Sequence, residues 1–181
     1  MRSLQGKGIL LSVIISQIVL YSHPAVSTNQ GRGEVTLNGQ IIASACAIGT
    51  NSIVQTIKMK TLPISQIMRD GQSGRQNFSI TLVNCVLEKP NPALSDWHYF
   101  EVTFDGRDDG GYFGIDGSAK GIALKISDES GNVAVPGIPM MKNEINPGGM
   151  TFHYYLRLVS NRQVFKAGEY ASTVRFKMDY Y

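Results

Sequence analysis

Side chains of the types that catalyse reactions stand close together near the middle of the chain. Ser95, Asp96 and His98 carry the hydroxyl, carboxylate and imidazole of a nucleophilic triad. A triad is assembled in space from separate segments, and residues this close together in one proline-rich loop do not generally converge in that geometry. A further histidine, His153, lies in an alternating strand pattern beside aromatic residues. We therefore predict no catalytic residues and no enzyme.

Two other features suggest a ligand. Asp105, Asp108, Asp109 and Asp116 lie in a glycine-rich stretch, and calcium is held by several carboxylate oxygens in flexible loops. Their spacing does not fit the EF-hand loop, and aspartate is a favoured turn residue, so we expect solvated turns, no metal and no cofactor. Trp97 could stack on a sugar, but a single loop aromatic more often packs against its own strand.

The first residues have the pattern of a signal peptide. Arg2 and Lys7 precede the apolar run at residues 8–22, and residues 25–27 offer small side chains at a cleavage site. The run is too short and too interrupted by polar residues for a typical membrane-spanning helix, although an uncleaved anchor is the alternative. We therefore predict a signal peptide over residues 1–27 and an exported protein.

The remaining chain is the size of one ordinary domain. The net charge of +3 owes two units to the signal peptide, and the charges of the mature part are interspersed. This distribution lacks the basic patch that nucleic-acid binding requires, so we predict no nucleic-acid partner.

Cys46 and Cys85 both lie in the exported part. In an oxidising compartment an even pair of cysteines indicates a disulfide, and two buried free thiols are the alternative. Zinc is not expected, because two cysteines without a nearby histidine give too few ligands for a tetrahedral site.

The elements that must position these residues are strands. Residues 77–85 alternate, with Phe78, Ile80, Leu82 and Asn84 on one face. A short helical turn is expected within residues 61–74, where Pro63 could occupy the first helical position. Turn residues separate the alternating segments that we predict to be strands, at residues 33–46, 77–85, 98–106, 121–132, 146–161 and 168–180. Short strands spaced by such turns are typical of an all-β sandwich.

The last predicted strand leaves this sandwich unfinished. Five of its alternate residues are apolar: Tyr170, Val174, Phe176, Met178 and Tyr180. Full burial of each side chain is worth about 1.5 to 3 kcal/mol, so this face represents about 8 to 15 kcal/mol, comparable to the net stability of a whole domain. No residues follow that could cover the face, and we expect a partner to supply a strand.

The other end of the mature chain carries a spare strand. Residues 28–37 are polar and punctuated by glycine, and alternate positions could enter the groove of another subunit: Gly31, Gly33, Val35 and Leu37. The sequence therefore has an incomplete face at one end and an unpaired arm at the other.

Together these segments resemble the pilus subunits of the chaperone-usher pathway of Gram-negative bacteria, as in P pili and type 1 fimbriae. The resemblance spans the mature chain and rests on "GRGEVTLNGQIIASAC", "FSITLVNC", "VTFDG" and "AKGIALKISDESGN", and on an ending with Gly168 fourteenth from the last residue and Tyr180 penultimate. It implies an incomplete immunoglobulin-like sandwich that lacks its last strand and is completed in trans by a donor strand.

The resemblance also implies roles for particular residues. Cys46 and Cys85 would form the family disulfide, and residues 28–37 would be the donor arm of a domain over residues 38–181. The strand from Gly168 to Tyr180 would line the groove that a periplasmic chaperone fills first and the arm of a neighbouring pilus subunit fills later. The implied partners are that chaperone, an outer-membrane usher and other subunits, and the implied location is the cell-surface pilus.

The type of subunit stays open at this point. Segments such as "LRLVSNRQVFKAGEY" are similar to the minor subunit that terminates and anchors a P-pilus rod, whereas the arm has the length of a rod subunit's arm. The alternative function is a single-domain adhesive subunit that binds a glycan or receptor.

Overall fold

The computed structural model describes residues 35–39 and 43–181. The chain divides between Gln40 and Ile41, so the short piece at residues 35–39 is considered by itself. That piece has no helix or strand, and every one of its residues is exposed. All further statements about the fold concern residues 43–181.

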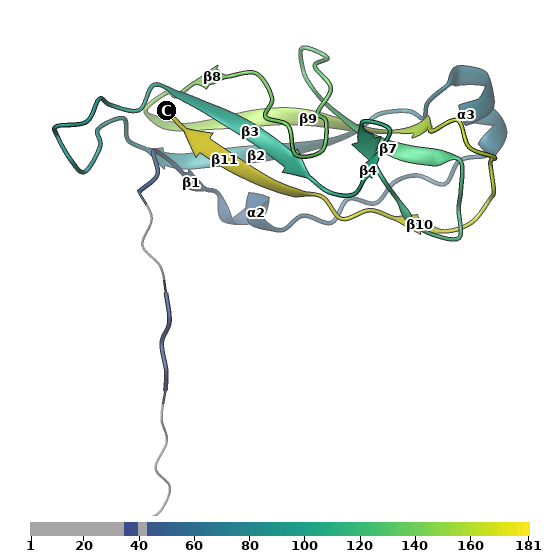
Figure 1. Ribbon diagram of the computed structural model, residues 1–181, viewed down its shortest axis with the longest axis horizontal. Helices are drawn as coiled ribbons and strands as arrows, with labels where there is room; N and C mark the ends of the chain where they lie inside the picture. Colours follow the sequence, from purple (N-terminus) through teal and green to yellow (C-terminus); the bar gives the residue numbers. More distant parts are fainter. Residues whose placement is uncertain (1–34, 40–42) are drawn as a thin grey trace, which may run out of the picture. The chain divides into compact units, whose positions relative to one another are not determined.

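A six-stranded antiparallel sheet forms one layer of the fold (Figure 1). Its strands follow the order β1, β2, β9, β7, β5, β4, which are Ala47–Ile48, Gln76–Cys85, Gly148–Ser160, Ile122–Asp128, Tyr112–Phe113 and Asp108–Asp109. The long strands β2, β9 and β7 lie side by side at its centre, with Gln76 opposite Leu156 and Ile126 also opposite Leu156. Apolar residues that alternate along each strand therefore meet on a common face.

A smaller sheet forms the other layer. Strand β3 (Tyr99–Asp105) lies between β11 (Arg175–Tyr180) and β8 (Asn143–Glu144). The strands β10 (Tyr170–Ala171) and β6 (Asp116–Gly117) pair separately. Two facing antiparallel sheets confirm the predicted all-β sandwich.

Two short helices connect β1 to β2. α2 spans Thr50–Ile53 and α3 spans Ile64–Asp70. Pro63 precedes α3 as its N-cap residue, and Gly71 ends it in the left-handed conformation with its N–H donating to the carbonyl oxygen of Ile67. The predicted helical turn is therefore present, one position later than expected. Neither described helix is long and apolar enough to cross a membrane.

The core lies between the two sheets. Aromatic rings from facing strands interlock there, with the Phe104 and Tyr154 centroids 5.1 Å apart and those of Phe100 and Phe152 4.9 Å apart. A smaller cluster lies under α3, where Ile67 packs with Ile122 and Leu158. In the strands that face this core, the buried residues are therefore those that the apolar alternation of the sequence predicts.

Three predicted details are wrong. In the described part of residues 33–46 there is no strand, and pairing with β2 begins only at Ala47. The last strand is interrupted between β10 and β11, because each pairs with a different strand. In β2 the alternation breaks at Asn84, whose φ of 53° marks an irregularity that leaves Asn84 exposed and turns Cys85 into the core.

Candidate functional site: an open groove along the last strand

A groove of about 1440 Å³ runs along the open side of the sandwich. One wall is the segment between α2 and α3, and the other is the chain from Phe165 through β10 to Phe176. In Figure 1 the first segment runs from α2 to α3, and the last one, in yellow, passes through β10 toward β11. The site is therefore elongated and bordered by two stretches of extended chain.

The first wall, residues 54–62, has an unpaired backbone. No backbone hydrogen bond joins it to any other described segment, and the contact from its edge is made by the Gln55 side chain, which donates to the carbonyl oxygen of Ser79 at 2.9 Å. Ile57 and Met59 are half-buried, whereas Lys58 and Lys60 are exposed. This alternation is that of a strand with one face on the groove.

The second wall continues into an edge strand, β11, whose first two residues, Arg175 and Phe176, line the groove. β11 pairs with β3 along its whole length, from Arg175 opposite Asp105 to Tyr180 opposite Phe100. Within the described residues nothing pairs with its other edge. Unpaired N–H and C=O groups therefore border the groove on both sides, as in a sheet that can accept one more strand.

The floor of the groove is the core itself. Phe78 and Phe104 line it together with side chains from β7 and β9, namely Leu124, Ile126, Leu156 and Leu158. Phe78 is packed within the floor, its ring 5.3 Å from that of Tyr154 and 6.2 Å from that of Phe104. An apolar chain lying in the groove would therefore cover surface that belongs to the main hydrophobic core.

The structure places four of the six predicted groove residues in the lining: Gly168, Tyr170, Val174 and Phe176. Met178 and Tyr180 lie on the same face of β11 as Phe176 but outside this lining. The side chains of Tyr170 and Tyr180 are half-buried, and this burial raises the pKa of both phenols above the ordinary tyrosine value. The predicted row therefore runs past the end of the groove lining, and its side chains from Val174 to Tyr180 are half-buried throughout.

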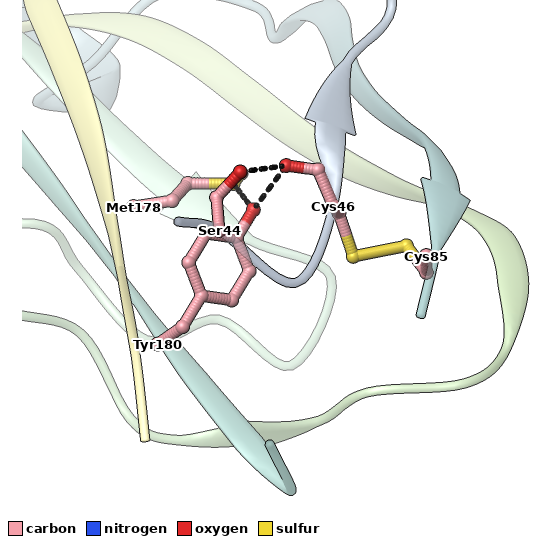
Figure 2. Close-up of a disulfide and its surroundings, with 5 residues drawn as sticks. All are labelled: Ser44, Cys46, Cys85, Met178 and Tyr180. Atoms are coloured by element: carbon pink, nitrogen blue, oxygen red, sulfur yellow. Dashed lines mark hydrogen bonds between the residues drawn. A yellow bond between two sulfur atoms is a disulfide. The ribbon is translucent and has the colours of Figure 1, made fainter. Parts of the chain in front are cut away.

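The end of β11 lies beside the disulfide. Cys46 and Cys85 are joined, and Figure 2 shows the Tyr180 side chain pointing toward the same carbonyl of Cys46 as Ser44. The Tyr180 hydroxyl donates to that carbonyl oxygen at 3.4 Å, and the Ser44 hydroxyl donates to it at 3.1 Å. The end of β11 is thus covered by the first residues of the domain.

The predicted donor arm falls largely outside the described residues, which include neither Gly31 nor Gly33. Val35 and Leu37 are described, and their side chains are 91% and 94% exposed. Binding of this segment in an apolar groove of another subunit would therefore remove two large apolar side chains from water.

The other candidate residues lie in ordinary surroundings. The Asp108 carboxylate accepts from the backbone N–H of Gly111 at 3.0 Å, and the Asp116 carboxylate lies 3.3 Å from Arg107. In the described part of the chain, no group of three His, Cys, Asp or Glu side chains could hold a metal ion. The Nζ of Lys89 lies 4.1 Å from the centre of the Trp97 ring, which also contacts Tyr180.

Sequence reasoning missed the first wall. Residues 54–62 follow a helix that was not predicted, and they contain only two obvious apolar alternations, at Ile57 and Met59. The sequence signal that could have identified this wall is the alternation of Ile57 and Met59 with lysines.

Comparison with known proteins gives consistent likenesses. The chain is 31% identical over 155 residues to a PRS fimbrial minor pilin protein of Escherichia coli, with 82% of this chain and 77% of that protein covered. It is 30% identical, with the same coverage, to a PAP fimbrial minor pilin protein of Escherichia coli. A Fimbria A protein of Serratia marcescens is 27% identical, with 86% of this chain and 88% of that protein covered. No protein-family model matches the chain.

Two solved structures share the fold. The P pilus rod subunit PapA superposes with a TM-score of 0.67 at 21% identity, covering 76% of this chain and all of that one. A chain from the structure of a chaperone-usher pilus gives a TM-score of 0.66 at 22% identity, covering 87% of this chain and 100% of that one.

Proposed function

Since this chain belongs to the family of fimbrial subunits that build chaperone-usher pili, we propose that its groove receives a β-strand from another protein. The chain is a structural pilus subunit and not an enzyme. The observation that carries the proposal is the pair of unpaired backbone edges on either side of an apolar floor. A strand laid between them would form main-chain hydrogen bonds and bury its apolar side chains, which is β-augmentation.

Two donors would use the groove in succession. A periplasmic chaperone would fill it while the subunit is carried to the outer-membrane usher, and the arm of a neighbouring subunit would replace the chaperone in the pilus. The exposure of Val35 and Leu37 supports an equivalent role for this chain's own arm, residues 28–37. The subunit would then be both an acceptor and a donor in the fibre at the cell surface.

A minor position in the pilus fits the comparisons best. The relatives at 31% and 30% identity are named minor pilins, whereas the Major MR/P fimbria protein of Proteus mirabilis is 26% identical. Structural or terminating roles are both compatible with a minor subunit. The adhesive alternative receives no comparable support, because Trp97 contacts Lys89 and Tyr180 of its own domain.

The test is strand exchange. The mature chain is purified with its chaperone, and synthetic peptides that copy its own arm and the arms of neighbouring subunits are added. Native mass spectrometry follows the loss of chaperone and the gain of peptide. A peptide with Val35→Asp and Leu37→Asp is the matched control, since it keeps the length but cannot place apolar side chains on the floor.

Each outcome has a distinct meaning. Displacement by an arm peptide and not by the control peptide would support a subunit that is extended in the fibre. An intact chaperone complex that refuses every arm would support a terminating subunit. A mature chain that is stable without a chaperone, and whose thermal unfolding no arm peptide changes, would contradict the proposal.

A further inference from the structure

The charges around the groove are strongly unbalanced. Its lining contains the five cationic side chains Lys58, Lys60, Lys120, Lys166 and Arg175 but only one carboxylate, that of Glu169. All six side chains are exposed. The ion pairs between described residues involve other cations, namely Arg69, Arg107 and Lys177. The groove therefore combines an apolar floor with a positively charged rim.

The positive charges stand on both walls. Lys58 and Lys60 alternate with the half-buried Ile57 and Met59 on the first wall. On the other side Lys120 and Lys166 are cross-strand partners, joined by reciprocal backbone hydrogen bonds of 3.0 and 3.1 Å. Like charges placed directly opposite one another on neighbouring strands destabilise a sheet. Within this chain the rim therefore carries repulsion that an acidic partner would relieve.

The residues of a strand in the groove would face the apolar floor and the positively charged rim in alternation. Every second side chain would point to the apolar floor, and those between would point outward, level with the rim. This inference rests on the proposed function. We propose that the groove favours an incoming strand from another protein that carries carboxylates at its outward positions and apolar residues at its inward ones.

The arm of this chain is not such a strand. If Gly31, Gly33, Val35 and Leu37 face the floor, the charged outward residues are Arg32 and Glu34, whose charges cancel. A second copy of this chain is therefore a poorer donor than a strand with two acidic outward residues. The groove thereby disfavours the arm of a second copy of this chain, because Arg32 carries the unfavourable charge.

The test is a competition between peptides that differ only at the outward positions. Peptides copying residues 28–37 carry Arg32→Glu in the acidic version and Glu34→Lys in the basic version, so the inward residues are identical. The full mature chain is refolded with an equal mixture of the two, which avoids any need for exchange with a chaperone. Native mass spectrometry then gives the ratio of the two complexes.

We expect the acidic peptide to be retained about tenfold over the basic one at low salt, since exposed ion pairs contribute modestly and additively at separate positions. At about 1 M salt the ratio should fall toward one, because the charges are screened. The double variant Lys58→Gln, Lys60→Gln should lower the preference. Lys125→Gln with Lys142→Gln is the matched control, since it removes two lysines outside the lining and should leave the ratio unchanged.

The failures of the two proposals are distinguishable. Uptake of both peptides in equal amounts at low salt would overturn the charge preference and leave strand uptake intact. A further control is the acidic peptide with its inward residues changed to serine. If it bound equally well, the preference would also be overturned, because the charge attraction would not depend on insertion into the groove. Uptake of no peptide on refolding would overturn the charge preference, whereas strand uptake itself is tested separately with the chaperone complex.

Discussion

Gly168 lies where the last segment of the chain passes closest to another backbone. A Cβ atom at this position would stand 2.7 Å from the backbone nitrogen of Ala119 and 2.7 Å from the carbonyl carbon of Ser118. Next to it, the carbonyl oxygen of Glu169 accepts from the N–H groups of both Ser118 and Ala119. The absence of a side chain at Gly168 therefore allows this wall of the groove to be hydrogen-bonded in place.

The change Gly168→Ala should lower the free energy of unfolding by about 1 to 3 kcal/mol, because backbone atoms must move to admit a methyl group. Chemical denaturation of the chain in complex with an arm peptide measures the effect. Gly74→Ala is the matched control, since no atom lies within 4 Å of its Cβ position. Equal stability of the two variants would show that the close approach does not constrain the wall.

At the scale of the strand, β7 and β9 carry two positively charged side chains directly opposite one another. Lys125 lies directly opposite Arg157, and both side chains are half-buried on the outer face of the large sheet. Neither takes part in an ion pair with another described residue. Repulsion between them therefore lowers the stability of the central strand pair.

Lys125→Glu should convert this repulsion into attraction and raise the free energy of unfolding by about 0.5 kcal/mol or slightly more. Equilibrium denaturation at low salt measures the gain, which should shrink when salt is added. Lys177→Glu is the control, because it replaces a lysine whose Nζ lies 2.7 Å from Asp179 and should not stabilise the chain. A loss of stability in Lys125→Glu would contradict the repulsion.

The sequence predicts a strand well where one of its faces is apolar and the other is polar. The prediction failed where the presence of a strand depends on hydrogen bonding to a neighbouring strand. Burial on one face is written into the alternation of Phe100, Val102 and Phe104, so β3 was predicted almost to its ends. Whether residues 33–46 form a strand depends on a neighbour, which composition does not reveal. The irregularity at Asn84 depends on a backbone angle that a single residue type does not specify.

The same distinction applies to the groove. Val174 and Phe176 were identified because they belong to a segment in which apolar and polar residues alternate, and both line the groove. The opposite wall was missed, because the alternation of Ile57 and Met59 with lysines is too short to predict an element by itself. The cationic rim was missed as well, because Lys58 and Lys166 are far apart along the chain and only the fold brings them to one groove.

For the whole molecule, the disulfide closes a loop that contains the first wall of the groove. Cys46 and Cys85 are separated by 39 positions, and residues 54–62 lie between them. In the chain-entropy model such a cross-link stabilises the folded state by roughly 4 kcal/mol. It limits how far the unpaired wall can move in the unfolded chain.

The double change Cys46→Ala, Cys85→Ala should therefore lower the free energy of unfolding by roughly 4 kcal/mol, a large part of the stability of an ordinary domain. Thermal unfolding of the peptide-bound chain, with and without a reductant, measures this loss. The reductant should destabilise the wild-type chain and leave the double variant unchanged. An unchanged melting temperature in the double variant would contradict the estimate.

The position of the disulfide also determines how the domain carries load. Directly after Cys46 the chain enters β1, which has only two residues paired with β2. Hydrogen bonds of so short a strand would yield first if the segment before Cys46 were pulled. The covalent link from Cys46 to Cys85 bypasses them and passes tension directly into the end of a ten-residue central strand. Tension applied just before Cys46 would therefore reach β2 without depending on the hydrogen bonds of β1.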